Sequence, residues 1–170
     1  MVTPGEVIPN PAGSDKHDLS PDAVILFDDL QKLSWRQFEA FCVELLAKQY
    51  QSQSAWLTKD GADFGADGLL AHENTAILIQ AKHKTGSYKG HQAVQEISQA
   101  SKMYEGPLGR KIEKLLFVTN ATKLAKNTYD VAKKLNVEVI EGNALTNLCE
   151  QHQIQMKQVL VRLEKKRFSI

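Results

Sequence analysis

The stretch that decides the fold is 59–82, which reads KDGADFGADGLLAHENTAILIQAK. It opens with a loop rich in glycine and aspartate, at 59–68, and continues with two apolar runs, GLLA at 68–71 and TAILIQAK at 75–82. The short polar turn His72-Glu73-Asn74 separates these runs. Two apolar runs of strand length on either side of a polar turn predict an antiparallel β-hairpin.

The register of this hairpin predicts which side chains meet. With a turn centred near Glu73 and Asn74, paired residues have numbers that sum to about 147–149, and Asp67 lies across from residues 80–82. Gln80 and Lys82 are two positions apart, so they share one face of their strand. The sequence therefore predicts one carboxylate, one amide and one ammonium group at a single patch beside the loop.

Such a patch is suited to a hard divalent cation and a phosphate. Carboxylate and amide oxygens are ligands for Mg²⁺, which keeps several waters that a phosphate can displace. A neighbouring lysine can stabilise the negative charge that develops on a phosphoryl group. Asp63 on the same loop and Glu39 on the preceding helix could add carboxylates. The alternatives are ordinary ones, since Asp67-Gly68 is also a common turn dipeptide and Lys82 could be an exposed strand-end residue.

The rest of the chain adds helices and strands to the hairpin. Ser34 and Gln37 form a capping box, and apolar residues recur with helical spacing after it. Pro107 and Gly109 are expected to stop the helix that follows the hairpin. Helices are predicted at 34–50, 91–104, 123–135, 143–151 and 153–166, and further strands at 55–58, 115–119 and 137–141. This order predicts an α/β fold with a central mixed sheet and helices on both of its faces.

Composition divides the chain into three parts. Residues 1–33, which hold most of the prolines, are predicted to form a flexible arm that ends in a short helix at 23–33. Residues 34–150 form one domain, large enough to bury a core. Residues 151–170 form a basic C-terminal helix.

Charge is distributed unevenly along the 170 residues. The chain holds 21 basic and 20 acidic residues, a net charge of +1, but residues 1–80 carry a net charge of −7 and residues 81–170 a net charge of +8. The basic half fits a polyanionic partner, and the acidic half fits a bound cation. The acidic residues of the arm could shield the basic surface when no partner is bound.

Other classes of protein are disfavoured. The two cysteines, Cys42 and Cys149, lie in apolar helical patterns and indicate neither a disulfide framework nor a zinc site. The sequence contains neither an apolar stretch long enough to cross a membrane nor a signal peptide, so we expect a cytoplasmic protein with no membrane partner. Walker A, dinucleotide-binding and HExxH motifs are missing.

With these residues in place, the sequence resembles the catalytic core of the Mrr-like restriction endonucleases, of the PD-(D/E)XK nuclease superfamily. The resemblance rests on the loop 60–67 (DGADFGAD), on Gln80-Ala81-Lys82, and on Phe38-Glu39 in the upstream helix. It continues through LLFVTN at 115–120 and VEVIEGNALTNL at 137–148, and covers roughly 34–150.

The resemblance implies a restriction-endonuclease-like fold and Mg²⁺-dependent hydrolysis of DNA in prokaryotic defence, with Mn²⁺ as a substitute. By motif, Asp67 would bind the metal and Lys82 would be the catalytic lysine. Gln80 stands where many superfamily members have Glu or Asp, Glu39 matches the helix carboxylate, and Asp63 matches the earlier acidic position of the loop. Ala66 stands where the superfamily pattern has proline.

Lys84, Tyr88, Lys89 and His91 follow the predicted site, where they form either a solvated loop or a set of contacts to DNA phosphates. Trp35 and Trp56 are expected in or at the edge of the core. A homodimer would supply the two active sites that cutting both strands requires, and the chain could be the N-terminal module of a longer protein.

Two other functions remain open from the sequence. One is a nucleic-acid-binding or assembly module of the same fold that does not cleave. The other is a small α/β enzyme or signalling domain that acts on a nucleotide, although a glycine-rich phosphate loop is missing.

Overall fold

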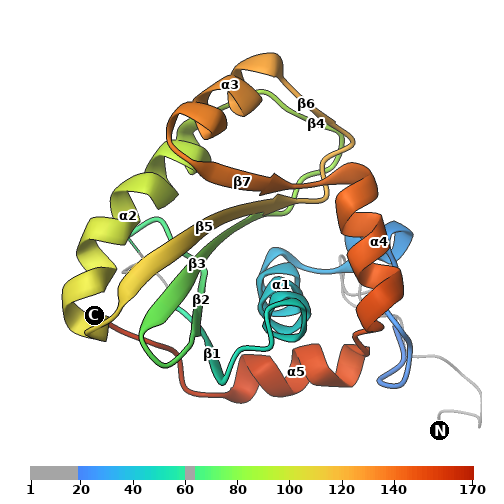
Figure 1. Cartoon of the computed structure of the whole chain (residues 1–170). Coiled ribbons are helices and arrows are strands. Elements are labelled where there is room, and N and C mark those ends of the chain that lie inside the picture. Colours follow the sequence, from blue (N-terminus) through green and yellow to red (C-terminus); the bar gives the residue numbers. More distant parts are fainter. Residues whose placement is uncertain (1–18, 60–63) are drawn as a thin grey trace, which may run out of the picture.

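A mixed β-sheet forms the centre of the protein. The computed structural model describes residues 19–59 and 64–170, and within them five strands pair in the order β1-β2-β3-β5-β7 (Figure 1). The β1–β2 and β2–β3 pairs are antiparallel, whereas β3–β5 and β5–β7 are parallel. The predicted mixed sheet is therefore confirmed. The strands are β1 (Ser54–Leu57), β2 (Gly68–Ala71), β3 (Thr75–Lys82), β5 (Lys111–Thr119) and β7 (Val137–Ile140).

Helices cover both faces of the sheet, as the sequence predicts. The helices α1 (Trp35–Gln49), α4 (Gly142–His152) and α5 (Met156–Glu164) lie on one face, and α2 (Gln92–Leu108) and α3 (Lys126–Lys134) on the other (Figure 1). The central strand β3 divides its side chains between the two layers, because side chains alternate along a strand. Ile77 and Ile79 pack in the core under α1, while Leu78 packs in the core under α2.

The start of α1 is fixed by its capping box. The amide N–H of Gln37 donates to Ser34 Oγ at 3.1 Å, and the Ser34 N–H donates to Gln37 Oε1 at 3.0 Å. Phe38, Phe41 and other apolar side chains of this helix are fully buried against the sheet. The position of Glu39 is set by this helix, because the cap and the buried face fix both its start and its rotation.

Several predicted helix boundaries differ from the observed ones. The helix α2 continues through Pro107 to Leu108, and it ends at Gly109, which has a left-handed φ of +60°. Proline in the last turn costs one backbone hydrogen bond, and the Gly109 N–H closes the helix on the Glu105 carbonyl at 3.0 Å. The short helix predicted at 23–33 is confined to a 3-10 helix, η2 (Phe27–Lys32).

The segment predicted as the start of the 123–135 helix is a strand instead. Lys123–Leu124 forms β6, which pairs in parallel with β4 (Ser87–Tyr88). The Thr122 N–H donates to the Gly86 carbonyl at 2.9 Å, and the Ala125 N–H donates to the Tyr88 carbonyl at 3.0 Å. This long-range pairing delays the helix, which begins at Lys126.

The segment before η2 and the helix α5 pack on the same layer as α1, in one core. The Ile25 N–H donates to the Ile154 carbonyl at 2.8 Å, so the segment before η2 is joined to the segment before α5. Arg162 of α5 donates to the Ala55 carbonyl at 2.7 Å and pairs with Glu44 of α1 at 3.1 Å.

Among the described residues, no helix combines the length and the apolar character needed to span a membrane.

Candidate active site

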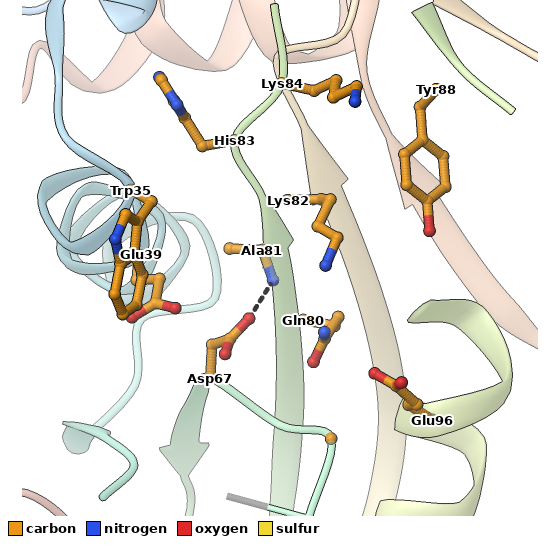
Figure 2. Close-up of a pocket in the computed structure, with 11 residues that line it drawn as sticks. Trp35, Glu39, Asp67, Gln80, Ala81, Lys82, His83, Lys84, Tyr88 and Glu96 are labelled. Carbon is orange, nitrogen blue, oxygen red and sulfur yellow. Dashed lines mark hydrogen bonds between the residues drawn. The ribbon is translucent and has the colours of Figure 1, made fainter. Parts of the chain in front are cut away.

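The hairpin β2–β3 brings Asp67 opposite Gln80. Gly68 pairs with Ile79, and the Asp67 N–H extends this ladder by donating to the Ile79 carbonyl at 2.7 Å. One residue farther along β3, the Ala81 N–H donates to Asp67 Oδ2 at 2.8 Å, drawn as a dashed line in Figure 2. The side chain of Asp67 thus takes the place of a backbone acceptor, and this bond fixes its orientation.

A pocket of about 670 Å³ opens where β2 and β3 separate. Its wall includes Glu39, Asp67, Gln80 and Lys82, which are four of the residues that the sequence singles out. In Figure 2, Glu39 and Asp67 lie on one side of β3, and Lys82 lies on the other side with its ammonium group directed toward Gln80. The structure thus brings two carboxylates, the amide and the lysine to one pocket.

Burial differs among these four side chains. Glu39 and Asp67 are 9% exposed and Gln80 is 6% exposed, whereas Lys82 is exposed. Gln80 Oε1 is buried and has no hydrogen-bond partner among the described residues. A buried amide oxygen without a hydrogen-bond partner costs stability. A cation bound at the pocket would satisfy this oxygen, so Gln80 is suited to the role of a metal ligand.

The pKa of the buried Cys42 thiol is affected by two carboxylates of the pocket. Burial raises the pKa of its thiol well above the usual value, and the carboxylates of Asp67 and Glu39 are among the charges that raise it further. The Cys42 thiol therefore stays neutral under the pocket, and it adds no charge to the two carboxylates.

Asp63, the remaining carboxylate predicted here, lies outside the described residues. Among the described residues, no three side chains of His, Cys, Asp or Glu lie together as a metal-binding group. A cation at this pocket would therefore depend on the amide oxygen of Gln80, on waters and on substrate oxygens in addition to carboxylates. Since Mg²⁺ keeps several waters and binds substrate phosphates, the residues present fit this ion.

Glu96 is a carboxylate of the pocket that the sequence analysis does not single out. It comes from α2 and points toward the pocket from the side opposite Glu39 (Figure 2). The sequence offers no signal for it, because glutamates are ordinary on the exposed side of a helix.

Trp35 differs from the prediction that it lies in or at the edge of the core. Its side chain is 53% exposed, and it lines the pocket one helical turn before Glu39. The guanidinium group of Arg36 lies 4.6 Å from the centre of its ring. Trp56 is half-buried and contacts the ring of Phe168.

Gly65 holds the loop that leads to Asp67 against α2. Its φ is +94°, and a Cβ atom placed on it would lie 2.7 Å from the backbone oxygen of Glu96. Only glycine fits both this conformation and this close approach. The loop and the second turn of α2 are therefore in direct contact at the edge of the pocket.

Gly65→Ala is expected to lower the free energy of unfolding by about 2–4 kcal/mol, because it adds both a strained backbone and a clash with Glu96. The matched control is Gly106→Ala, in the helix α2 that carries Glu96. Gly106 has open space around its Cα and no positive φ, so alanine there is expected to stabilise by up to about 1 kcal/mol. Urea denaturation measures both changes. A Gly65→Ala variant as stable as the wild type would contradict the close packing described.

The four residues predicted to contact DNA do not all lie at the pocket. Lys84 and Tyr88 line the pocket, and Tyr88 also borders a second hollow that contains Lys89 and Lys123. His91 precedes α2, and its Nδ1 lies 3.3 Å from the side-chain nitrogen of Asn127. Tyr88 packs its ring on Phe117, with 5.6 Å between the ring centres. The β4–β6 pair thus carries a basic surface from the pocket to Lys123.

Comparison with known proteins identifies the family. The profile of the restriction endonuclease family Mrr_cat matches residues 30–149, which is more than half of the chain. The chain therefore belongs to this restriction endonuclease family, and the resemblance noted from the sequence is confirmed. A search of the curated proteins gave no match.

Two solved structures are similar to the chain, each at 15% sequence identity. One is the MspJI restriction endonuclease in complex with a 27-mer oligonucleotide, with a TM-score of 0.45. The match covers 76% of this chain and 30% of MspJI, so this chain spans less than a third of that protein. The other is the small subunit of the heterodimeric restriction endonuclease R.BspD6I, with a TM-score of 0.40 and coverage of 81% and 92%.

Proposed function

We propose that this protein is a metal-dependent DNA endonuclease that hydrolyses phosphodiester bonds in prokaryotic restriction. The observation that carries the proposal is the arrangement of Asp67, Gln80 and Lys82 in one pocket, with the buried Gln80 oxygen unpartnered among the described residues. Family membership supports the reaction type. Restriction would place the activity in the cytoplasm, where incoming DNA is met.

In this proposal Asp67 and Gln80 hold Mg²⁺ or Mn²⁺, with Glu39 close by and Asp63 as a further carboxylate from the loop. When bound, the cation would neutralise phosphate charge and lower the pKa of a water. The Ala81 N–H keeps the Asp67 carboxylate aimed at the pocket. Burial of Gln80 and Asp67 excludes bulk water from their side chains, which strengthens their attraction to charge.

Lys82 acts on the substrate in this mechanism. Its exposed ammonium group can donate hydrogen bonds to a non-bridging phosphate oxygen and to the attacking water. As water attacks in line and gives up a proton to solvent, the P–O bond to the leaving group breaks, the leaving oxygen takes up a proton from solvent, and negative charge grows on the phosphorus oxygens. The Lys82 ammonium group beside those oxygens stabilises this growing charge more than it stabilises the charge of the ground state. This difference lowers the barrier and accelerates the reaction.

Removal of divalent metal tests the reaction type. With excess EDTA, nicking of supercoiled plasmid is expected to stop, and Mg²⁺ or Mn²⁺ is expected to restore it. Both unmethylated and methylated plasmids serve as substrates, and open circles or linear products show whether one or both strands are cut. Cleavage at an unchanged rate in EDTA would contradict the proposal. Two-strand cutting would support a homodimer, which light scattering can check.

Lys84 and Lys89 are proposed to contact DNA phosphates, together with Tyr88 and His91. Each single Lys→Ala variant is expected to weaken DNA binding regardless of sequence and to reduce the salt slope of log Kd by about 1, since one phosphate contact is lost. Fluorescence anisotropy of a labelled duplex at several salt concentrations measures this slope. Lys157→Ala, on α5 and paired with Asp22, is the control. An unchanged slope for Lys84→Ala would remove that residue from the interface.

The neutral Gln80 favours one alternative, a DNA-binding or assembly module of the same fold that does not cleave. An amide holds a cation more weakly than a carboxylate does, and the described residues hold no group of three His, Cys, Asp or Glu ligands. The whole protein could also be a module of a longer chain. DNA binding without cleavage, across metals and across modified substrates, would favour this alternative.

A further inference from the structure

Glu96 lies at the same pocket as the proposed cation but comes from a different part of the fold. It is on α2, and it lines the pocket with Asp67, Gln80 and Lys82. Gln80 faces this helix, because Leu78, two residues earlier on β3, packs in the core with Val94 and Ile97 of α2. Figure 2 shows the Glu96 carboxylate directed toward the Gln80 side of the pocket.

The position of Glu96 is fixed by the backbone around it. Gly65 approaches so closely that an added Cβ would lie within 3 Å of the Glu96 backbone oxygen, carbonyl carbon and Cβ. Val94 and Ile97 on either side of Glu96 are fully buried and prevent rotation of the helix. The carboxylate is therefore held beside the loop that leads to Asp67.

Gln80 offers the cation a neutral ligand. Gln80 is 6% exposed, and its buried Oε1 has no hydrogen-bond partner among the described residues. In Figure 2 its side chain lies between those of Asp67 and Glu96, so its amide oxygen is available as a ligand there. An amide oxygen can bind a divalent cation, but it contributes no negative charge to offset that of the ion. A carboxylate on the facing helix can supply this charge, either directly or through one of the waters that Mg²⁺ keeps.

We propose that Glu96 is an additional carboxylate of the cation site and supplies from α2 the negative charge that Gln80 lacks on β3. The inference rests on the proposed function, because it concerns the same cation. It assigns to α2 a role in metal binding in addition to its role in covering the sheet.

The test measures binding of Mn²⁺ alone to the full chain, by titration with electron paramagnetic resonance. Glu96→Gln is expected to weaken Mn²⁺ binding by about ten- to a hundredfold, the loss typical for groups that support a metal site. The double variant Gln80→Glu/Glu96→Gln moves the carboxylate from α2 to β3, and it is expected to regain most of the affinity. Glu150→Gln, on the exposed side of α4, is the control and should bind like the wild type.

The outcomes separate this inference from the proposed function. If Asp67→Asn loses Mn²⁺ binding while Glu96→Gln binds like the wild type, the cation site stands and the role of Glu96 is overturned. The same holds if Glu96→Gln slows cleavage at unchanged Mn²⁺ affinity, because Glu96 would then affect the reaction without contributing to the cation site. If the double variant binds Mn²⁺ no better than Glu96→Gln, a carboxylate at position 80 does not replace the one at position 96, and the role proposed for Glu96 is overturned. If Asp67→Asn has no effect on Mn²⁺ binding, the proposed function itself fails.

Discussion

Asp67→Asn is expected to lower the rate of DNA cleavage by about a thousandfold or more. The asparagine side-chain oxygen can still accept the hydrogen bond from the Ala81 N–H, so the hairpin should keep its geometry. The lost charge is what changes, and metal-assisted stabilisation of a phosphoryl group is worth several kcal/mol, with each 1.4 kcal/mol a factor of about ten in rate. Single-turnover cleavage of a labelled duplex measures the rate.

The matched control for this substitution is Asp130→Asn. Asp130 is an exposed carboxylate on α3 that pairs with Lys126 one turn earlier, and it lies outside the pocket. It should cleave like the wild type. Circular dichroism should show that both variants are folded. Cleavage by a folded Asp67→Asn variant within tenfold of the wild type would remove Asp67 from the proposed site.

Lys82→Met is expected to lower the cleavage rate by about a hundred- to a thousandfold while leaving Mn²⁺ binding in place. The reason is that its ammonium group is proposed to act on the phosphate and the water, and the loss of one such donor typically costs this much. Methionine keeps the length and apolar stem of lysine. The contact from Thr119 Oγ1 to the Lys82 backbone carbonyl, at 2.7 Å, does not depend on the side chain.

The two substitutions are thus expected to differ in one measurement and agree in the other. Asp67→Asn should lose both Mn²⁺ binding and cleavage, whereas Lys82→Met should lose cleavage alone. Lys102→Met, an exposed lysine on α2, controls for the loss of one positive charge. Equal cleavage by Lys82→Met and Lys102→Met would show that Lys82 has no part in the reaction.

The central hairpin could be predicted from the sequence because its signals are local. The polar turn at 72–74 fixes the pairing, and the apolar residues on either side leave little freedom in register. The observed pair Gly68–Ile79 falls within the predicted range, so Asp67 lies opposite Gln80 as expected. The capping box at Ser34 likewise predicts the start of α1, and with it the helix that carries Glu39.

The parts that could not be predicted depend on contacts between distant segments. The pairing of β4 with β6 joins residues 36 positions apart, and it overrides the helical pattern at 123–125. Glu96 joins the pocket because α2 packs closely against Gly65, in the loop before β2. The exposure of Trp35 depends on which parts of α1 the rest of the fold covers. The sequence pattern at the start of an amphipathic helix is the same whether the apolar residue there is buried or exposed.

The exposed Trp35 gives the protein an optical signal of its own. The chain has two tryptophans, and Trp56 is half-buried in β1 against Phe168. A Trp56→Phe variant would therefore emit from Trp35 alone, at the wall of the pocket. Indole emission depends on the polarity and on the quenchers around the ring. Entry of DNA or of a cation into the pocket could then be followed in real time without an attached dye.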